Sequence, residues 1–371
     1  MKKNFFFVET LEKNTGWGTL TLNYLRKFNK KNVIIFCVKK NIKYKFKQIE
    51  ILPEVLELIK NPFLVYFTFK KINKILLKCK QKNIKLISHF TVEPYVLLLA
   101  FEKLFYKNIY YAIGTYSTVL KNNFSTNYIF KLAIKKISNL IYFSSYTKKK
   151  LSGIIDLKKI KNNMIVNPVI YPKKYRKYNF KKYSKTTIIS VGMLKARKGY
   201  HNLIEVMNIL INKYNLDINL CIVGKKSSEG TYFNFLSSKI KDYNLSKFIE
   251  IKTNVEAIEL DKIYKKSHMF VLLSEDQKDY FEGFGIVYLE ALSFNLPVVL
   301  SKKSGAIDLK NVDKFLNFFN PKDYDSIAKY IKDFFKRKIE YKNHKYVKIL
   351  NKHNKLNDLK ITNFYKKEIF T

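Results

Sequence analysis

The chain has 371 residues, of which 47% are hydrophobic and 16% aromatic, and this composition excludes a disordered protein. Its formal net charge of +42 is typical of proteins that bind nucleic acid or an anionic membrane. Only four of the 71 cations are arginine, the preferred group for bidentate contacts to phosphate and base edges, so nucleic acid is disfavoured. Abundant Lys, Asn, Ile, Phe and Tyr beside scarce Gly and Pro are typical of an AT-rich genome. The charge therefore reflects either codon bias or selection for an anionic surface.

Cysteine usage and hydropathy indicate the compartment. The three cysteines lie far apart in apolar segments, which excludes a disulfide framework and a metal knuckle. The first apolar stretch, Phe5–Val8, is too short for a secretion signal, and the longest, Tyr95–Phe101, is well short of the roughly 20 residues that cross a bilayer. We therefore expect a cytoplasmic protein without a membrane-spanning segment.

Short β-branched and aromatic runs alternate with longer amphipathic stretches from the N-terminus onward. This alternation predicts an α/β protein with parallel sheets that are covered by helices on both faces. In the first half, the expected strands are Phe5–Val8, Val33–Val38, Ile84–Ser88, Ile109–Ile113, Leu140–Phe143 and Met164–Val166. The expected helices are Leu64–Lys80, Glu93–Phe105 and Tyr128–Ile137.

The second half repeats the same plan. Its expected strands are Thr187–Val191, Asn219–Val223, Phe248–Ile251, Met269–Leu273, Pro297–Leu300 and Leu316–Phe319. Its expected helices are Tyr200–Lys213, Tyr232–Tyr243, Ala257–Lys266 and Val287–Phe294. Two doubly wound domains follow, over residues 1–170 and 186–340, joined by a basic and aromatic linker at 171–185. The tail, 341–371, is expected to be helical and either caps the second domain or returns to the first.

The strongest chemical signal follows the strand Met269–Leu273, because ligands of parallel α/β sheets bind beyond the carboxyl ends of the strands. A polar loop ends at Glu282, and a helix that begins near Gly285 carries Glu290. The free N–H groups of such a helix start favour a phosphate. Two glutamates eight positions apart span about 12 Å along a helix, so they can bind hydroxyls at opposite ends of a nucleotide sugar.

The residues Phe281 to Leu292 read Phe-Glu-Gly-Phe-Gly-Ile-Val-Tyr-Leu-Glu-Ala-Leu, and Asn-Leu-Pro-Val-Val follows from Asn295. This pattern resembles the signature of retaining glycosyltransferases of family 4. Further matches occur in the expected order, at Ser190–Leu194, Arg197–Gly199, Ile222–Gly224, Ser274 and Ser301–Asp308. The resemblance covers roughly residues 186–310, and the N-terminal half only in outline. It implies the GT-B fold, in which two Rossmann-like domains face each other across a cleft.

The resemblance also implies roles for these residues. Glu290 would hold the ribose hydroxyls of the donor, whereas Glu282 would act in catalysis beside the transferred sugar. Lys198 would stabilise the leaving diphosphate, because a nucleoside diphosphate leaves more easily where its charge meets preorganised donors. The expected donor-binding residues are Gly16, Gly18, Arg197, Lys198, Gly283, Phe284, Gly285 and Glu290. The alternative interpretation is that both glutamates and Lys198 are merely solvated.

Two positions depart from the family pattern. The arginine usual after the first glycine is Met193 here, so the phosphate charge must rest on the lysine or arginine of the basic loop. The histidine usual before Gly-Thr-Tyr is Ile113, whose side chain can neither donate nor accept a proton. We still expect Gly114 and Thr115 on the acceptor side, through their backbone.

Two further features of the N-terminal half have open interpretations. The loop Asn14–Thr19, with Gly16 and Gly18, resembles the family's glycine-rich loop beneath the donor phosphates, but a plain turn is the alternative. His89 follows the expected strand Ile84–Ser88 and would therefore point into the cleft on the acceptor side. A buried structural histidine is the alternative there.

The sequence shows no cluster of residues with metal-ligand spacing. Its only Asp-x-Asp, Asp323-Tyr324-Asp325, could carry a divalent cation, but it opens an expected helix, and helix capping is the interpretation that we favour. We expect a metal-independent enzyme without a cofactor.

Together these features predict a retaining glycosyltransferase that moves a sugar from a nucleoside diphosphate sugar, with UDP the first choice, to an acceptor hydroxyl. Bacterial surface glycan synthesis (lipopolysaccharide, capsule or lipid-linked oligosaccharide) is the expected setting, with a glycan or lipid-linked acceptor at the inner face of the cytoplasmic membrane and no nucleic acid partner. A phosphorylase or sucrose-type synthase on the same fold is one alternative. A basic RNA- or membrane-binding protein with a degenerate GT-B cleft is the other.

Overall fold

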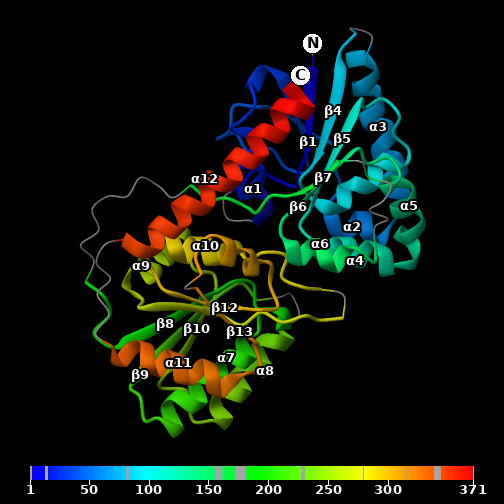
Figure 1. Ribbon diagram of the computed structural model, residues 1–371. Helices are drawn as coiled ribbons and strands as arrows, with labels where there is room; N and C mark the ends of the chain where they lie inside the picture. The colour runs from blue at the N-terminus through cyan, green and yellow to red at the C-terminus, as the bar shows by residue number, and fades with distance from the viewer. Residues whose placement is uncertain are drawn as a thin grey trace. The chain divides into compact units, whose positions relative to one another are not determined.

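The computed structural model describes residues 2–12, 16–80, 83–154, 160, 162–171, 181–226, 230–278, 280–314, 316–337 and 344–370. The chain forms two compact units (Figure 1). Unit 1 comprises Met1–Ile170 together with Asn357–Thr371, and unit 2 comprises Tyr171–Leu356. Most of the expected linker, residues 172–180, lies outside the described residues.

Unit 1 is built on a parallel sheet of seven strands in the order β3-β2-β1-β4-β5-β6-β7. Every pairing in this sheet is parallel, and the order reverses between β1 and β4. The strands are β1 (Lys2–Phe7), β2 (Val33–Cys37), β3 (Lys47–Glu50), β4 (Lys85–Phe90), β5 (Lys107–Ala112), β6 (Asn139–Tyr142) and β7 (Asn162–Ile165).

The helices of unit 1 connect these parallel strands. They are α1 (Gly16–Leu25), α2 (Val55–Lys60), α3 (Phe63–Lys80), α4 (Thr115–Asn122), α5 (Phe124–Ile134) and α6 (Ser145–Leu151), with 3₁₀ segments at Lys30–Asn32 and Glu93–Ala100. The 3₁₀ segment Glu93–Ala100 replaces the α-helix expected at Glu93–Phe105. The segment is almost entirely buried, which removes the polar face that an amphipathic surface helix requires.

The core of unit 1 is aromatic. Phe5, Phe6 and Phe7 are fully buried on β1 and point alternately to the two faces of the sheet. Phe5 stacks on Phe36 at 5.6 Å, and Phe7 stacks on Phe90 at 4.5 Å between ring centroids. Burial on both faces explains why these three successive residues of β1 are all apolar and do not alternate with polar ones.

Unit 2 contains a parallel sheet of six strands in the order β10-β9-β8-β11-β12-β13. The strands are β8 (Thr186–Val191), β9 (Ile218–Val223), β10 (Ile249–Lys252), β11 (Met269–Leu272), β12 (Val298–Ser301) and β13 (Asn317–Phe319). Two parallel sheets that are each interleaved with helices confirm the predicted pair of doubly wound α/β domains.

Helices cover both faces of the sheet of unit 2. Figure 1 shows α9 (Ala257–Lys266) and α10 (Ile286–Ser293) on one face, with α7 (Tyr200–Asn208) and α11 (Tyr324–Lys336) on the other. Other helical segments in the described part of unit 2 are α8 (Thr231–Asp242), a π-helical end of α7 at Ile209–Lys213, and 3₁₀ turns at Ala196–Lys198 and Gly305–Asn311.

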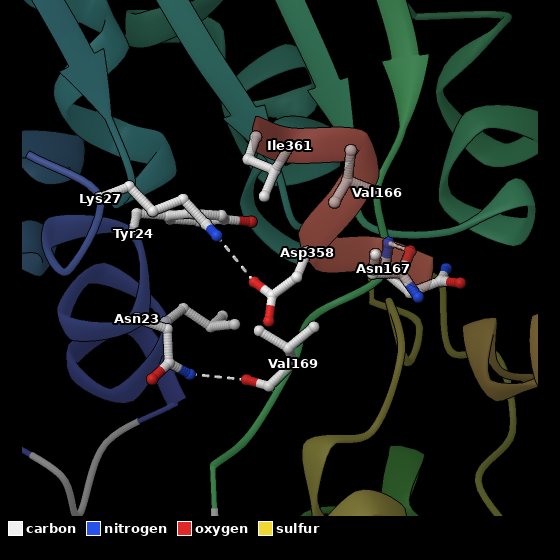
Figure 2. Close-up of a pocket in the computed structure, with 10 residues that line it drawn as sticks. Asn23, Tyr24, Lys27, Val166, Asn167, Val169, Asp358 and Ile361 are labelled. Carbon is white, nitrogen blue, oxygen red and sulfur yellow. Dashed lines mark hydrogen bonds and ion pairs between the residues drawn. The ribbon is translucent and has the colours of Figure 1, made fainter. Parts of the chain in front are cut away.

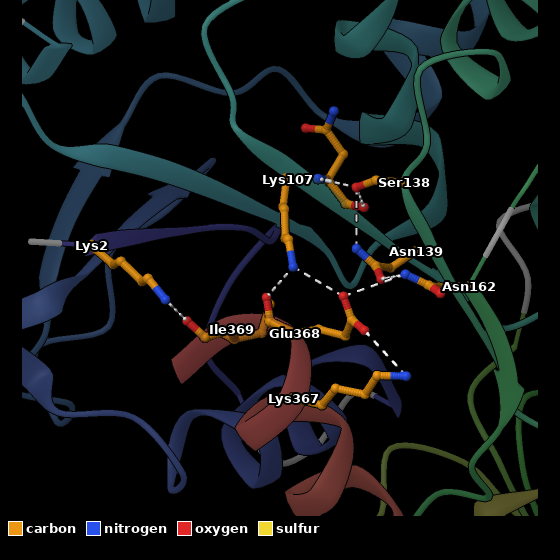
Figure 3. A network of polar contacts seen from close by, with 9 residues as sticks. Lys2, Lys107, Ser138, Asn139, Asn162, Lys367, Glu368 and Ile369 are labelled. Carbon is orange, nitrogen blue, oxygen red and sulfur yellow. Dashed lines mark hydrogen bonds and ion pairs between the residues drawn. The ribbon is translucent and has the colours of Figure 1, made fainter. Parts of the chain in front are cut away.

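The chain returns to unit 1 through its last helix, α12 (Lys345–Tyr365), which continues as a π-helical turn at Lys366–Phe370. In Figure 3, the Lys107 ammonium donates to the backbone carbonyl of Glu368 at 2.7 Å and pairs with its carboxylate at 3.0 Å. Lys2 donates to the carbonyl of Ile369 at 2.9 Å. The hydroxyls of Tyr365 and Tyr111 lie 2.6 Å apart in the core. These contacts fix the C-terminal segment against β1 and β5.

None of the helices in the described ranges combines the length and the apolar character that a membrane span requires.

Candidate active site

Two loops at the carboxyl ends of neighbouring strands in unit 2 lie against each other. The first follows β8 and contains Arg197, Lys198 and Gly199, and the second follows β11. The backbone N–H of Glu275, in the second loop, donates to the carbonyl of Arg197 at 3.0 Å. A Cβ atom on Gly199 would lie 1.8 Å from the carbonyl oxygen of Leu273, so only glycine allows the loops to approach this closely.

This approach brings Glu282 between the two cations of the basic loop. Its Oε2 atom lies 2.5 Å from Nη1 of Arg197 and 2.7 Å from Nζ of Lys198. The Glu282 and Lys198 side chains are each only 9% exposed, and the Arg197 side chain is 19% exposed. The backbone carbonyl of Glu282 accepts the N–H of Gly305 at 3.0 Å, which fixes the residue on its other side.

The charges in this cluster stabilise each other. Burial opposes ionisation of Glu282, but Lys198 and Arg197 outweigh it, so the pKa of the carboxyl is below its usual value. Burial lowers the pKa of Lys198, and the attraction of Glu282 partly offsets that effect. Two cations and one carboxylate leave the cluster with a net positive charge of one. A buried site with this charge can bind an anion such as a phosphate.

Glu290 lies on α10, whose N-cap is Gly285 with φ +88°. Its Oε2 atom accepts a hydrogen bond from the Tyr264 hydroxyl at 3.2 Å. Burial raises the pKa of Glu290, while the Tyr264 hydrogen bond and the positive charge of Lys198 oppose the rise. The field of Lys198 therefore reaches both glutamates, and Phe284, in the turn between them, is buried.

Two residues that the sequence did not indicate support these loops. Glu275 accepts from Nδ2 of Asn202 at 3.3 Å and lies 3.2 Å from Nε2 of His201, which ties the start of α7 to the end of β11. The Tyr288 hydroxyl donates to the carbonyl of Leu272 at 2.6 Å and thereby ties α10 to β11. The position of Glu275 directly after Ser274, at the carboxyl end of a buried strand, is the sequence signal that could have indicated it.

No group of three or more His, Cys, Asp or Glu side chains that could hold a metal ion occurs among the described residues. In the Asp-x-Asp pair, Asp323 caps α11 by accepting the N–H of Ser326 at 3.4 Å, and Asp325 pairs with Lys213 at 2.9 Å. The capping interpretation of Asp323 is therefore confirmed.

His89 lies inside its strand and not beyond it, so its expected position is wrong. It belongs to β4, is fully buried, and stacks on Phe6 with 4.2 Å between ring centroids. Its ring nitrogens bond to the Tyr111 hydroxyl at 3.1 Å and to Oδ1 of Asn4 at 3.0 Å. Burial lowers the pKa of His89 to about 3. Both ring nitrogens are thus hydrogen-bonded in the core, and His89 is a buried structural histidine.

The glycines expected in the first loop belong to a helix. Gly16 and Gly18 lie in the first turn of α1, whereas Asn14 and Thr15 lie outside the described residues. Gly114 precedes α4 with φ +113°, a conformation that favours glycine, and Thr115 is the first residue of that helix. The chain of unit 1 thus places a helix start after β1 and another after β5.

A buried acid that the sequence did not single out holds the second of these helix starts. Glu93 is fully buried, and its carboxylate accepts the N–H groups of Gly114 at 2.7 Å and Tyr116 at 2.9 Å. Burial raises its pKa, while these hydrogen bonds oppose the rise. A lone acid beside the most apolar run of the chain could have indicated this role, because such a carboxylate must be hydrogen-bonded inside the fold.

A small pocket of unit 1 lies between α1, the segment after β7 and α12 (Figure 2). Two contacts close it: Nδ2 of Asn23 donates to the carbonyl of Val169 at 2.6 Å, and Lys27 pairs with Asp358 at 2.9 Å. None of the predicted site residues lines this pocket.

Comparison with known proteins supports the assignment of unit 2. Residues 173–349 match the family described as glycosyl transferases group 1. The second unit carries a glycosyltransferase domain. An uncharacterized glycosyltransferase of Haemophilus influenzae is 24% identical over 307 residues, which cover 81% of this chain and 80% of that protein. The O-antigen chain mannosyltransferase RfbU of Salmonella typhimurium is 26% identical over 47% of this chain and 45% of that protein.

Solved structures show the fold of the whole chain. A glycosyltransferase from Rickettsia africae has a TM-score of 0.71 at 16% identity and covers 99% of this chain and 98% of its own. HepE from Anabaena, solved in complex with UDP, has a TM-score of 0.65 at 14% identity, with 96% and 95% covered. The two doubly wound domains and these likenesses identify the fold as GT-B.

The departure at Met193 has a structural counterpart in the glycosyltransferase domain. The side chain of Met193 is 46% exposed and carries no charge, so this position of the loop supplies no cation. Arg197, four residues later, instead places its guanidinium on Glu282 beside Lys198. The sequence indicated both cations, but their pairing with Glu282 is a finding of the structure.

Proposed function

We propose that the chain is a retaining, metal-independent glycosyltransferase that transfers a sugar from a nucleoside diphosphate sugar to an acceptor hydroxyl. The observation that carries the proposal is the buried contact of Glu282 with Arg197 and Lys198, eight residues before Glu290. The group 1 family match and the fold likeness to a protein that binds UDP support it. UDP is the first choice of donor nucleotide.

The donor is proposed to bind with its diphosphate at the cationic cluster. Arg197 and Lys198 face the phosphates, and the turn of Gly283, Phe284 and Gly285 presents backbone amides at the start of α10. Glu290 accepts hydrogen bonds from the ribose hydroxyls, while Tyr264 holds its carboxylate in place. Because Glu282 already holds Arg197 and Lys198 in place, the two cations are in position for the phosphates when the donor arrives.

The transfer follows from this arrangement. The bond between the anomeric carbon and the phosphate oxygen breaks, and the acceptor oxygen attacks from the same face of the sugar. The acceptor proton passes to the leaving phosphate, which Lys198 and Arg197 stabilise as its charge develops. Glu282 contacts the transferred sugar and opposes the positive charge that builds on its ring. No step needs a metal ion or a resident cofactor.

Nucleotide binding provides the direct test. We expect one of UDP, GDP, ADP and CMP to raise the thermal midpoint by several degrees, because a ligand at 100 times its Kd stabilises by about 2.7 kcal/mol. The shift should be the same in excess EDTA and in Mg²⁺. No shift with any nucleotide would favour a protein with a degenerate site, and a shift that requires the metal would contradict the assignment of the phosphates to lysine and arginine.

The acceptor is proposed to be a glycan or lipid-linked sugar of the bacterial surface, reached from the inner face of the cytoplasmic membrane. The similarity to an O-antigen chain mannosyltransferase supports this setting. The outward face of α3 supports it too, because Phe63 and Phe67 are 73% and 57% exposed and the lysines of the following turns are also exposed. No acid occurs on this helix. Exposed rings beside lysines suit an anionic lipid surface.

Liposome sedimentation tests this attachment. Lys70, Lys71 and Lys74 lie on α3, and each lysine near an anionic surface contributes about 1 kcal/mol. We expect binding to anionic vesicles, release at high salt, and strong loss when these three lysines become Glu. The matched control reverses the exposed Lys345, Lys348 and Lys352 of α12 and should retain binding. If both triple variants lose vesicle binding equally, the binding comes from the basic surface in general and not from α3. A soluble acceptor would then agree with the data as well as a lipid-linked one.

A further inference from the structure

Three segments that follow neighbouring strands of unit 1 meet where the strand order reverses. β4 lies between β1 and β5 in the sheet, and the reversal falls between β1 and β4. Trp17 lies in the first turn of the helix after β1, Glu93 follows β4, and Tyr116 lies in the first turn of the helix after β5. In open parallel sheets, the crevice at such a reversal is the place where ligands bind.

The rings of Trp17 and Tyr116 form a pair at this place. Their centroids lie 5.3 Å apart at an angle of 49°, and both residues are partly buried. Aromatic faces carry partial negative charge, and the C–H groups on the flat face of a sugar ring carry partial positive charge. A pair of aromatic rings held in one position therefore suits a pyranose ring, which adds hydroxyls at its rim for polar contacts.

Glu93 fixes the backbone of Tyr116, one residue of the pair, and occupies the donors of this helix start. Its carboxylate accepts the backbone N–H of Tyr116 at 2.9 Å and the hydroxyl of Ser117 at 2.9 Å. These groups, with the N–H of Gly114, are the donors that a phosphate would otherwise use at the start of α4. Because the buried side chain of Glu93 already occupies these donors, they are not available to an anionic ligand.

We propose that Trp17 and Tyr116 form the platform on which the acceptor sugar stacks, with Glu93 as the residue that positions Tyr116. The platform takes a neutral pyranose ring and not the nucleotide. The inference rests on the proposed glycosyltransferase function and names the acceptor class of the same reaction.

Trp17 is the single tryptophan of the chain, so the tryptophan emission of the intact protein reports on this platform alone. We expect a saturable change in emission with at least one methyl glycoside of glucose, galactose, mannose or N-acetylglucosamine, titrated through the millimolar range. Tyr116→Leu should weaken the response roughly fivefold, because stacking on one ring contributes a modest part of the affinity. In a transfer assay the same variant should raise the acceptor KM and leave the donor KM unchanged.

Tyr128→Leu is the matched control, because Tyr128 belongs to α5 of the same unit and is 71% exposed. It should retain the wild-type response. An emission that no glycoside changes, or that UDP changes and the glycosides do not, would overturn the platform. The nucleotide-induced thermal shift is measured on the same samples. A nucleotide-induced shift without any response to a glycoside would reject the platform alone. Absence of the nucleotide-induced shift would reject the proposed function.

Discussion

Glu282→Gln should lower kcat on the order of a hundredfold and leave nucleotide binding at least as strong as in the unchanged chain. In the proposed reaction the carboxylate contributes negative charge beside the transferred sugar, and preorganised electrostatic groups in active sites are worth roughly two to three orders of magnitude in rate. The variant also leaves Arg197 and Lys198 without the counter-charge that they share at 2.5 and 2.7 Å. A bound diphosphate can supply that charge, so the nucleotide-induced thermal shift should grow while turnover falls.

Glu290→Gln is the matched comparison, since it removes the same charge from the same loop-and-helix segment. Loss of the Glu290 charge should weaken nucleotide binding by about 1.5–3 kcal/mol, because hydrogen bonds between a carboxylate and ribose hydroxyls are charge-assisted. Steady-state kinetics should therefore separate the variants, with kcat reduced in one and donor KM raised in the other. Equal and negligible effects of both substitutions would show that the glutamate pattern has no part in the reaction.

The strands could be predicted from the sequence because most of them are buried on both faces. The run Phe5–Phe7 in β1 and the whole of β2 are apolar without a break, which is the pattern of a strand that is buried on both faces. β3, with the sequence Lys-Gln-Ile-Glu, was not predicted. It pairs with β2 alone at the edge of the sheet, and its residues are only partly buried or exposed, so packing does not select apolar side chains there.

The candidate site could be predicted only where its residues are close together in the sequence. The spacing of Glu282 and Glu290 is local and places one at a loop end and the other on the next helix. The contact between Arg197 and Glu282 joins residues 85 positions apart, and it depends on how β8 and β11 pair in the sheet. No local pattern contains that information.

The misplacement of His89 has a simple physical origin. A polar residue at the end of an apolar run usually marks the end of a strand, but here Asn4 and Tyr111 satisfy both ring nitrogens inside the core. The strand therefore continues to Phe90. Glu93 was missed because the backbone N–H groups that satisfy its carboxylate, those of Gly114 and Tyr116, lie more than twenty residues later in the sequence.

Gly199→Ala should destabilise unit 2 by about 3 kcal/mol or more, which corresponds to a fall of roughly 10 °C in the thermal midpoint. Gly199 has φ +67°, and a Cβ atom there would lie 1.8 Å from the oxygen and 2.6 Å from the carbon of the Leu273 carbonyl. These are backbone atoms at the end of β11, so relief requires the basic loop to move away from the strand. Arg197 and Lys198 would move with it, and the nucleotide-induced shift should fall as well.

Gly230→Ala separates the steric clash from the cost of the backbone conformation. Gly230 also precedes a helix of unit 2 and has φ +66°, but a Cβ atom there would meet no described heavy atom within 4 Å. Alanine there should cost only the conformational strain, about 1 kcal/mol, and lower the midpoint by roughly 3 °C. Thermal unfolding of the two variants beside the unchanged chain measures the difference. If both substitutions lower the midpoint equally, the close approach of the two loops is not what holds Arg197 and Lys198 at Glu282, and the cluster must form without it.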